Sequence, residues 1–299
     1  MIVQNFTVSI GEILISYQYD KSIIAKGNEP FVAFLTPQYM PDGKSHIMNY
    51  VSVVDKIPSA NIDVEMTAST IYWKMWTVSS GYHIEFFNNE GLLTSIVKSN
   101  NNFTVNKIIM LRDILNSTVF LPSDVHAFLL IGYFGFRDIG LFIHGSMIRY
   151  QDKGVIFSGI SGSGKSTICA LASEFLNQKI ITDDRILVRF NDGVECYSTP
   201  YDWKIERCNN IKTHMGCIVY LKHGSSNWIR KLSYDEKMMK LFSTNLLPFF
   251  VPEGMLRIAK AFDLIVNSVP IIEYHFKPDR SAIEYLLLYL RQNTSCFGE

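Results

Sequence analysis

One segment, 154–175, constrains the fold of this chain more than any other: GVIFSGISGSGKSTICALASEF. An apolar run at 155–157 predicts a strand, and it leads directly into Gly-x-x-x-x-Gly-Lys-Ser at 159–166, the full Walker A pattern. Apolar residues then recur at helical spacing, at Ile168, Leu171, Ala172, Phe175 and Leu176. The sequence therefore predicts strand, glycine loop and helix in succession, which is the context in which this motif binds nucleoside triphosphates.

The chemistry of such a loop follows from its backbone. Glycines let successive N–H groups turn toward phosphate oxygens, and the helix N-terminus adds a partial positive charge. Lys165 is expected to contact the β and γ phosphates of ATP or GTP, and the Ser166 hydroxyl to ligate Mg²⁺. A chance match in a loop rich in Gly and Ser is the alternative, and the flanking strand and helix argue against it. The residues assigned to nucleotide binding are Gly159, Ser161, Gly162, Ser163, Gly164, Lys165, Ser166 and Thr167.

Composition narrows the class of partner and compartment. The chain has 299 residues, enough for one large or two modest domains, and 47% of them are hydrophobic. Because 28 basic residues balance 28 acidic ones and form no long cluster, we expect no nucleic-acid partner. The five cysteines are odd in number and scattered, which favours a reducing, intracellular compartment over a disulfide framework.

Two segments of the chain bear on targeting and on membrane insertion. Residues 1–20 lack the basic start and long apolar core of a signal peptide. The most apolar segment, 127–136, is too short to cross a bilayer and runs into Arg137 and Asp138, so a buried helix explains it better. We therefore expect a cytoplasmic protein without a membrane partner.

The pattern of the chain changes twice. Residues 1 to about 103 are β-rich and include two strands, 81–87 and 92–97, around a turn. From 104 to 136 helical spacing is expected, first from Val105, Ile108, Ile109 and Leu115, then in a second helix capped at Pro122-Ser123. From Gly140 strands return at 141–144, 155–157, 185–190 and 216–221, with a hairpin turn at Asp192-Gly193 and helices at 233–247 and 281–292. This predicts a β-rich N-terminal domain with a helical linker, 1–125, and an α/β nucleotide-binding catalytic domain, 126–299.

Polar residues beside the loop complete a candidate site. Asp183 and Asp184 end a short apolar run about one helix length after the loop. Carboxylates in that position near a nucleotide hold Mg²⁺ or act as a base, although alone such a pair reads as a solvated turn. His144 closes a strand and, taken alone, is a structural histidine. Cys208, His214, Cys217 and His223 suggest zinc, but their separations do not give the paired spacing that one tetrahedral ion prefers.

Three motifs carry a family resemblance. IHGS at 143–146, GISGSGKST at 159–167 and ITDDRILV at 181–188 resemble, in order and spacing, the catalytic domain of HPr kinase/phosphorylase. The chain is most similar to the HPr-kinase-like proteins, some of which are peptide kinases in ribosomal peptide biosynthesis. Segments 198–203 and 269–274 also look like that family, so the resemblance covers roughly residues 140 to 290.

The resemblance implies a fold and a reaction. It implies a P-loop-containing, phosphoenolpyruvate-carboxykinase-like core that uses ATP and Mg²⁺ to phosphorylate a serine of a peptide or small protein. Asp184 would then be the base that accepts the hydroxyl proton, His144 and Lys165 would lie by the phosphates, and Asp183 would act beside Asp184 and hold the metal with Ser166. Glu206, in 204–208, is a loose counterpart of a further metal-binding glutamate of the family.

Two differences from the bifunctional enzymes of this family favour kinase activity alone. The bifunctional enzymes have Gly-Ile-Gly-Lys-Ser-Glu where this chain has GSGKST at 162–167, and their glycine-rich loop is absent after Arg207. We therefore expect no phosphorylase activity and a peptide or small-protein substrate with an acceptor serine. The alternatives are an idle nucleotide-binding module that senses or scaffolds, and an HPr or small-molecule phosphotransferase. The intact lysine, serine, aspartates and histidine argue against the idle module, and a homo-oligomer is left open.

Overall fold

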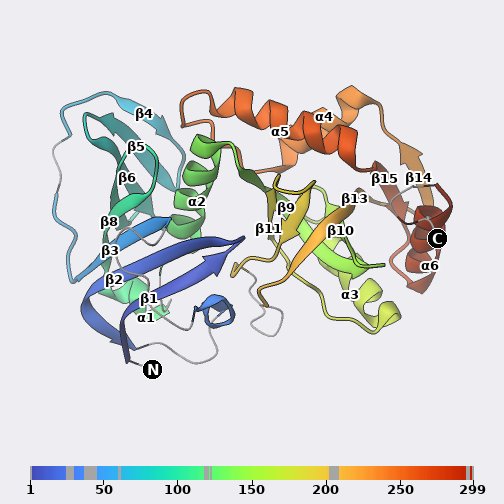
Figure 1. Cartoon of the computed structure of the whole chain (residues 1–299), viewed down its shortest axis with the longest axis horizontal. Coiled ribbons are helices and arrows are strands. Elements are labelled where there is room, and N and C mark those ends of the chain that lie inside the picture. The colour runs from blue at the N-terminus through green and yellow to red at the C-terminus, as the bar shows by residue number, and fades with distance from the viewer. Residues whose placement is uncertain are drawn as a thin grey trace. The chain divides into compact units, whose positions relative to one another are not determined.

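The structure, a computed structural model, describes residues 2–24, 30–36, 46–59, 62–117, 121, 123–201, 209–293 and 297. The chain divides into two compact units (Figure 1). Unit 1 comprises Met1–Arg137 and Pro248–Gly254, and unit 2 comprises Asp138–Leu247 and Met255–Glu299. The candidate loop at 159–166 belongs to unit 2.

Unit 1 is built on one eight-stranded sheet in the order β1-β2-β3-β8-β7-β6-β5-β4. The pairs β2–β3 and β3–β8 are parallel and the other neighbours are antiparallel. Its strands are β1 (Ile2–Ile10), β2 (Ile13–Ile24), β3 (Ile47–Val54), β4 (Met66–Ser69), β5 (Trp73–Val78), β6 (Gly81–Phe87), β7 (Leu93–Ser99) and β8 (Val105–Leu111). Its helices are η1 (Pro30–Phe34), α1 (Arg112–Ser117) and α2 (Ser123–Arg137).

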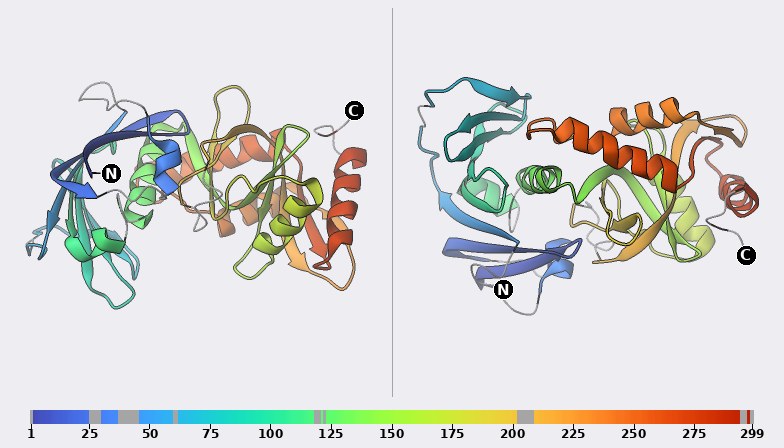
Figure 2. Two further views of the ribbon diagram at one scale, coloured as in Figure 1. Left: turned by 90° about the horizontal axis from the view of Figure 1, so that it is seen from below. Right: turned by 45° about the horizontal axis from the view of Figure 1, so that its top comes forward.

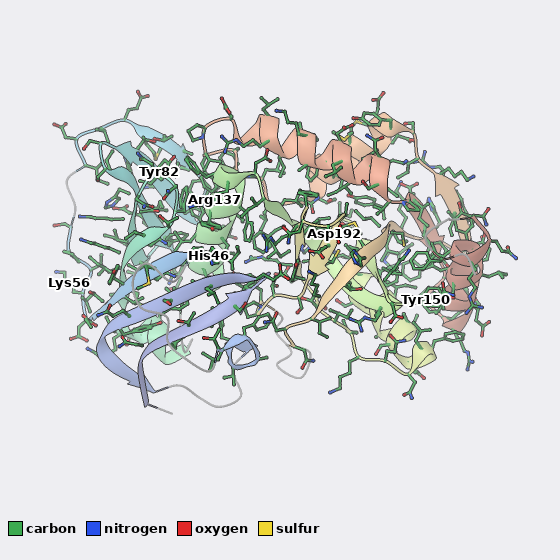
Figure 3. All side chains as sticks on the ribbon, in the orientation of Figure 1. His46, Lys56, Tyr82, Arg137, Tyr150 and Asp192 are labelled. Carbon is green, nitrogen blue, oxygen red and sulfur yellow. The ribbon has the colours of Figure 1, made fainter. Side chains whose placement is uncertain are left out.

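Helix α2 is the apolar segment that the sequence predicts as a buried helix, and this prediction is confirmed. Its Phe128 ring stacks on Phe250 at 4.3 Å between centroids and meets Phe86 of β6 edge-on at 5.5 Å. Tyr82 lies near the start of the same strand (Figure 3) and stacks on Phe103 at 4.9 Å. No helix among the described residues has both the length and the apolar character needed to cross a membrane.

The prediction of a helix from residue 104 is wrong, because residues 105–111 form strand β8. Val105, Ile108 and Ile109 suggested a helical face, but burial along the segment alternates with period two. Asn106 faces the interior and donates to Asn49 Oδ1 of β3 at 2.9 Å, whereas Val105 is 40% exposed. Pairing with β3 and β7 on either side decides the conformation of a segment whose local pattern fits both.

Unit 2 is built on a seven-stranded sheet in the order β10-β9-β11-β12-β13-β15-β14, and β10 also pairs with β13. Only β10–β13 and β13–β15 are parallel. Its strands are β9 (Gly140–Tyr150), β10 (Lys153–Ser158), β11 (Arg185–Arg189), β12 (Glu195–Tyr197), β13 (Lys212–His223), β14 (Trp228–Lys231) and β15 (Ile271–Phe276). Its helices are α3 (Lys165–Leu176), α4 (Tyr234–Thr244), α5 (Gly254–Ser268) and α6 (Arg280–Asn293).

The fold class predicted from the sequence, an α/β carboxykinase-like P-loop core, is therefore wrong. Over the residues that the structure describes, the chain is mostly β and is built on two mixed sheets of eight and seven strands. Most neighbouring strands of both sheets pair antiparallel, whereas an α/β fold is built on a mostly parallel sheet. Strands β9 and β10 instead form an antiparallel hairpin, and β11 and β12 form another around Asp192 (Figure 3) and Gly193, as the turn signal there predicts.

Helices cover both faces of the sheet of unit 2 (Figures 1 and 2). On one face Leu241 of α4 and Phe262 of α5 pack with Ile218 of β13. On the other, Ile168 of α3 and Leu286 of α6 pack on the opposite side of the same strands. Arg291 of α6 also donates to the hydroxyl of Tyr150 at the end of β9 (Figure 3).

Helices α3, α4 and α6 confirm the helical predictions for these segments. Ser233 caps α4 through a reciprocal pair of bonds with Glu236, the capping box that fixes a helix start. Helix α5 is an element that the sequence prediction missed.

Candidate functional site

The glycine loop occupies the position that its sequence context predicts. Strand β10 is buried from 154 to 158, the loop follows, and α3 begins at Lys165. Gly159, Gly162 and Gly164 have φ of +146°, +77° and +91°, a region that side chains other than glycine rarely adopt. A Cβ on Gly164 would lie 2.6 Å from the Phe276 ring, so this turn requires glycine for space as well as for conformation.

The N-terminus of α3 is open to an anion. Gly164 is the N-cap residue, and no side chain caps the helix there. The first-turn N–H groups of a helix have no intrahelical acceptor, and together with the helix dipole they favour phosphate. Lys165 extends back over the loop and donates to the carbonyls of Gly159 at 3.0 Å and Ile160 at 3.1 Å. Burial lowers the pKa of Lys165 more than the attraction of Asp183 and Asp184 raises it.

A histidine that the sequence analysis assigned no role here supports the loop from the next strand. His223 ends β13, the parallel neighbour of β10, and its Nε2 lies 2.8 Å from the Gly162 carbonyl. Its ring also lies 5.7 Å from that of Phe276. The available signal was its place at the carboxyl end of a buried strand, where loops of parallel strands meet.

Asp183 connects strand β9 with helix α3, which follows the glycine loop. It accepts a hydrogen bond from Ser146 of β9 and another from Ser166 of α3, the latter at 3.2 Å. The Ser166 hydroxyl and the Asp183 carboxylate are hard oxygen ligands held together, which is the donor chemistry that Mg²⁺ prefers. These two residues therefore fit the metal role that the motifs assign to them.

Asp184 lies in a small ionic cluster with two neighbours. His144 Nδ1 is 2.9 Å from the Asp184 carbonyl and 3.2 Å from its Oδ1, and Arg185 Nε is 3.4 Å from its Oδ2. Asp184 has φ of +82°, which is costly for a residue with a Cβ. Burial raises the pKa of Asp184, but the hydrogen bond from His144 and the positive charge of Arg185 outweigh it and hold that pKa below its usual value.

The register of the sheet brings these groups together. Strands β9 and β11 pair with Arg185 opposite His144, which places Asp184 beside Gly145 in the middle of β9, whose N–H donates to the Asp184 carbonyl at 3.1 Å. Asn245, just after α4, accepts the His144 N–H at 2.8 Å and donates to the Leu241 carbonyl at 2.7 Å. Ser158 donates to the His144 carbonyl at 2.8 Å, so both backbone polar groups of the histidine are fixed. No local pattern pointed to Asn245, which lies 101 residues from His144.

These groups surround one cavity of about 450 Å³, within the range of small-molecule sites. Gly159 and Ser163 line the neighbouring cavity instead, and Glu206 lies outside the described residues. The remaining predicted site residues all line the 450 Å³ cavity, together with His223. Its lining is His144, Ser161, Gly162, Gly164, Lys165, Ser166, Thr167, Asp183, Asp184 and His223.

The residues considered for zinc do not come together. His214 and His223 lie near opposite ends of the twelve-residue strand β13, and Cys217 is buried between them. Cys208 lies outside the described residues. Within the described ranges no three side chains of His, Cys, Asp or Glu are grouped as a metal ion would need.

Compared with models of known protein families and with curated proteins, the chain matches none of them. The features that indicate a function are therefore the geometry and chemistry of this cavity and the motifs that line it.

Proposed function

We propose that this protein is an ATP-dependent, Mg²⁺-dependent kinase that phosphorylates a serine of a peptide or small protein. The observation that carries the proposal is the single cavity lined by the uncapped start of α3, Lys165, Ser166 and the two aspartates. Phosphoryl transfer needs a phosphate cradle, a cation, metal ligands and a carboxylate that faces the acceptor hydroxyl. The order and spacing of the three motifs, which resemble HPr kinase/phosphorylase, also support it.

The nucleotide takes its phosphates to the start of α3. Lys165 exchanges two neutral loop carbonyls for charged phosphate oxygens, which are stronger acceptors. Ser166 and Asp183 would hold Mg²⁺, which would supply positive charge to offset that of the phosphates. GTP fits the same phosphate contacts, since none of them reads the base.

Asp184 orients the acceptor hydroxyl and takes its proton as the new O–P bond forms, while the bond between the γ-phosphorus and the β,γ-bridging oxygen breaks and ADP leaves. Its lowered pKa keeps it ionised at neutral pH and therefore able to accept a hydrogen bond from the serine. A low pKa also makes it a weak base, which suits a loose transition state in which the proton leaves late. His144 and Arg185 act here as positioning residues, because they hold the two carboxylate oxygens from one side.

The reaction consumes ATP, so we place the protein in the cytoplasm. The odd number and scattered positions of the five cysteines agree with a reducing compartment.

The test is transfer of labelled γ-phosphate from ATP to serine peptides. Asp184→Asn keeps size and polarity but cannot take the proton, so turnover should fall by about 10²–10⁴-fold while nucleotide still binds. Asp183→Asn is the neighbouring control. It should instead lower the affinity for Mg²⁺, so that transfer needs a higher Mg²⁺ concentration. Near-normal transfer by Asp184→Asn would remove Asp184 as the base. Nucleotide binding by the wild type without transfer to any serine peptide would favour the idle module.

A further inference from the structure

A second cavity is lined by the glycine loop and extends beyond it to residues that none of the three motifs includes. Its volume is about 440 Å³, and it shares Ser161, Gly162 and His223 with the nucleotide cavity, so the loop is their common wall. Beyond the loop, its lining comes from the end of β13 and from α4: Tyr220, Leu221, Lys222, His223, Lys240, Ser243 and Thr244.

The sheet places a buried carboxylate beneath this cavity. Glu273 of β15 pairs in register with Tyr220 of β13 and with Arg230 of β14, and is 2% exposed. Two residues further along, Lys222 pairs with His275. Since alternate residues of a strand share a face, all of these side chains lie on the face that α4 covers.

This cluster holds an excess of positive charge. Lys240 Nζ is 2.8 Å and Lys222 Nζ is 3.4 Å from the same oxygen of Glu273. The other oxygen of Glu273 lies 3.1 Å from Arg230 Nε and 3.1 Å from His275 Nε2. Burial raises the pKa of Glu273, but its hydrogen bonds with Lys240, Arg230 and His275 outweigh this and keep it far below its usual value.

One positive charge in the cluster therefore has no counter-charge. Arg230 has a second carboxylate partner, Glu236 at 2.6 Å. Within the described ranges the two lysines pair with Glu273 alone. Three fixed cations, Arg230, Lys222 and Lys240, thus face two carboxylates, Glu273 and Glu236.

The surplus charge is available to a ligand. The Lys222 side chain is 54% exposed and that of Lys240 24%, while the carboxylate that anchors both is buried. An anchored lysine loses less conformational freedom on binding than a free one, so the arrangement favours anion binding. The hydroxyls of Ser243 and Thr244 line the same cavity, and both donate to the Lys240 carbonyl, at 3.2 and 2.7 Å.

The surroundings indicate a peptide rather than a small anion. Ser243 also lines a shallow apolar cavity along α4, with Met238, Met239 and Phe242. Met239 is 64% exposed. A chain that follows these cavities would pass from an apolar surface, over two lysines, to the wall of the nucleotide site.

We propose that the cavity bounded by Lys222 and Lys240 binds a carboxylate of the acceptor peptide close to its phosphorylated serine. The carboxylate belongs either to an acidic side chain or to the chain terminus. This inference rests on the proposed kinase function, whose nucleotide occupies the other side of the loop.

The probe is a set of serine peptides in which one Glu is placed at successive positions around the serine. Each peptide has a control with Gln in place of that Glu. Every peptide is made once with a free and once with an amidated C-terminus. Both binding of labelled peptide and transfer of phosphate are measured on the full chain. The wild type should prefer the carboxylate at one position, or the free terminus. Lys240→Gln and Lys222→Gln should each weaken this preference about tenfold, the effect of one charge-assisted hydrogen bond. Both lysines are partners of buried Glu273, but Lys222 is the more exposed and the more distant of the two, so Lys222→Gln is the variant that disturbs folding less.

Lys237→Gln is the matched control, since it removes a lysine of the same helix that does not line the cavity. It should keep the carboxylate preference, and every variant should keep wild-type nucleotide affinity. Carboxylate-dependent binding without transfer would support the subsite while the kinase proposal fails. Transfer with no preference for a carboxylate would overturn the subsite and leave the kinase intact. Loss of nucleotide affinity in Lys222→Gln would also overturn it, by assigning the cavity to the nucleotide.

Discussion

Two glycines of the loop allow its backbone geometry to be tested by a matched pair of variants. Gly162 has φ of +77° and nothing within 4 Å of a built Cβ, whereas Gly164 has φ of +91° and a Cβ there meets Phe276 at 2.6 Å. Alanine at either position carries the left-handed backbone cost of about 1–2 kcal/mol. Only Gly164→Ala also forces a methyl against a fully buried ring, which adds about 1–3 kcal/mol.

The expected result is that Gly164→Ala lowers the free energy of unfolding by about 1–3 kcal/mol more than Gly162→Ala does. Urea denaturation followed by circular dichroism measures both values. Phe276→Leu in the Gly164→Ala background should recover part of the loss, and the double-mutant cycle then isolates the clash. Equal stabilities for the two alanine variants would refute the close approach of Phe276 to the start of α3.

Three further outcomes are expected. Lys165→Ala should abolish the rise in melting temperature that Mg-nucleotide produces, which for the wild type at a hundredfold excess over Kd corresponds to about 2.7 kcal/mol; an unchanged rise would exclude the loop as the phosphate site. The pKa of Asp184 is lower in the folded state, so its stabilising contribution is present above its unfolded pKa and is lost as the pH falls through the folded value. Asp184→Asn should therefore flatten the acid side of the stability curve measured by urea denaturation between pH 6 and about pH 3, and a curve parallel to the wild type would contradict the ionic cluster. Asn245→Ala leaves the His144 N–H without its acceptor, costing about 1–3 kcal/mol, and should slow transfer without changing nucleotide affinity; equal loss of both would assign Asn245 to the fold rather than to the site.

The loop was predictable because its information is consecutive in the chain. The strand, the glycines with positive φ and the helix lie within 153–176, and each carries a local signal. The β6–β7 and β11–β12 hairpins were predictable for the same reason, since a tight turn brings each pair of strands together. Helix α5 also carried a usable signal in the helical spacing of Ile258, Phe262 and Ile265, all buried on one side, which the sequence reading passed over.

The fold class was not predictable in this way, because it depends on which distant strands pair. Strand β10 is joined to β13 across some sixty residues, with Val155 opposite Cys217, and nothing local specifies that partner. The same limit applies to the site. His223 reaches Gly162 from 61 residues away and Asn245 reaches His144 from 101, so both roles arise only when the sheet and α4 are in place. The prediction for strand β8 failed for a related reason. Its local pattern fits both the helical and the strand period, and pairing with β3 and β7 selects the strand.

The site as it stands also indicates which ligand must rearrange it. Lys165 is held by loop carbonyls that a nucleotide has to displace, and charged phosphate oxygens can do so because they are the stronger acceptors. Asp184 is held by His144 and Arg185, which a neutral serine hydroxyl could not displace. It does not need to, because a carboxylate has about four acceptor positions and can take one more hydrogen bond while keeping both partners. In the proposed reaction the nucleotide alone therefore has to change the existing contacts, and the acceptor meets a carboxylate already in place.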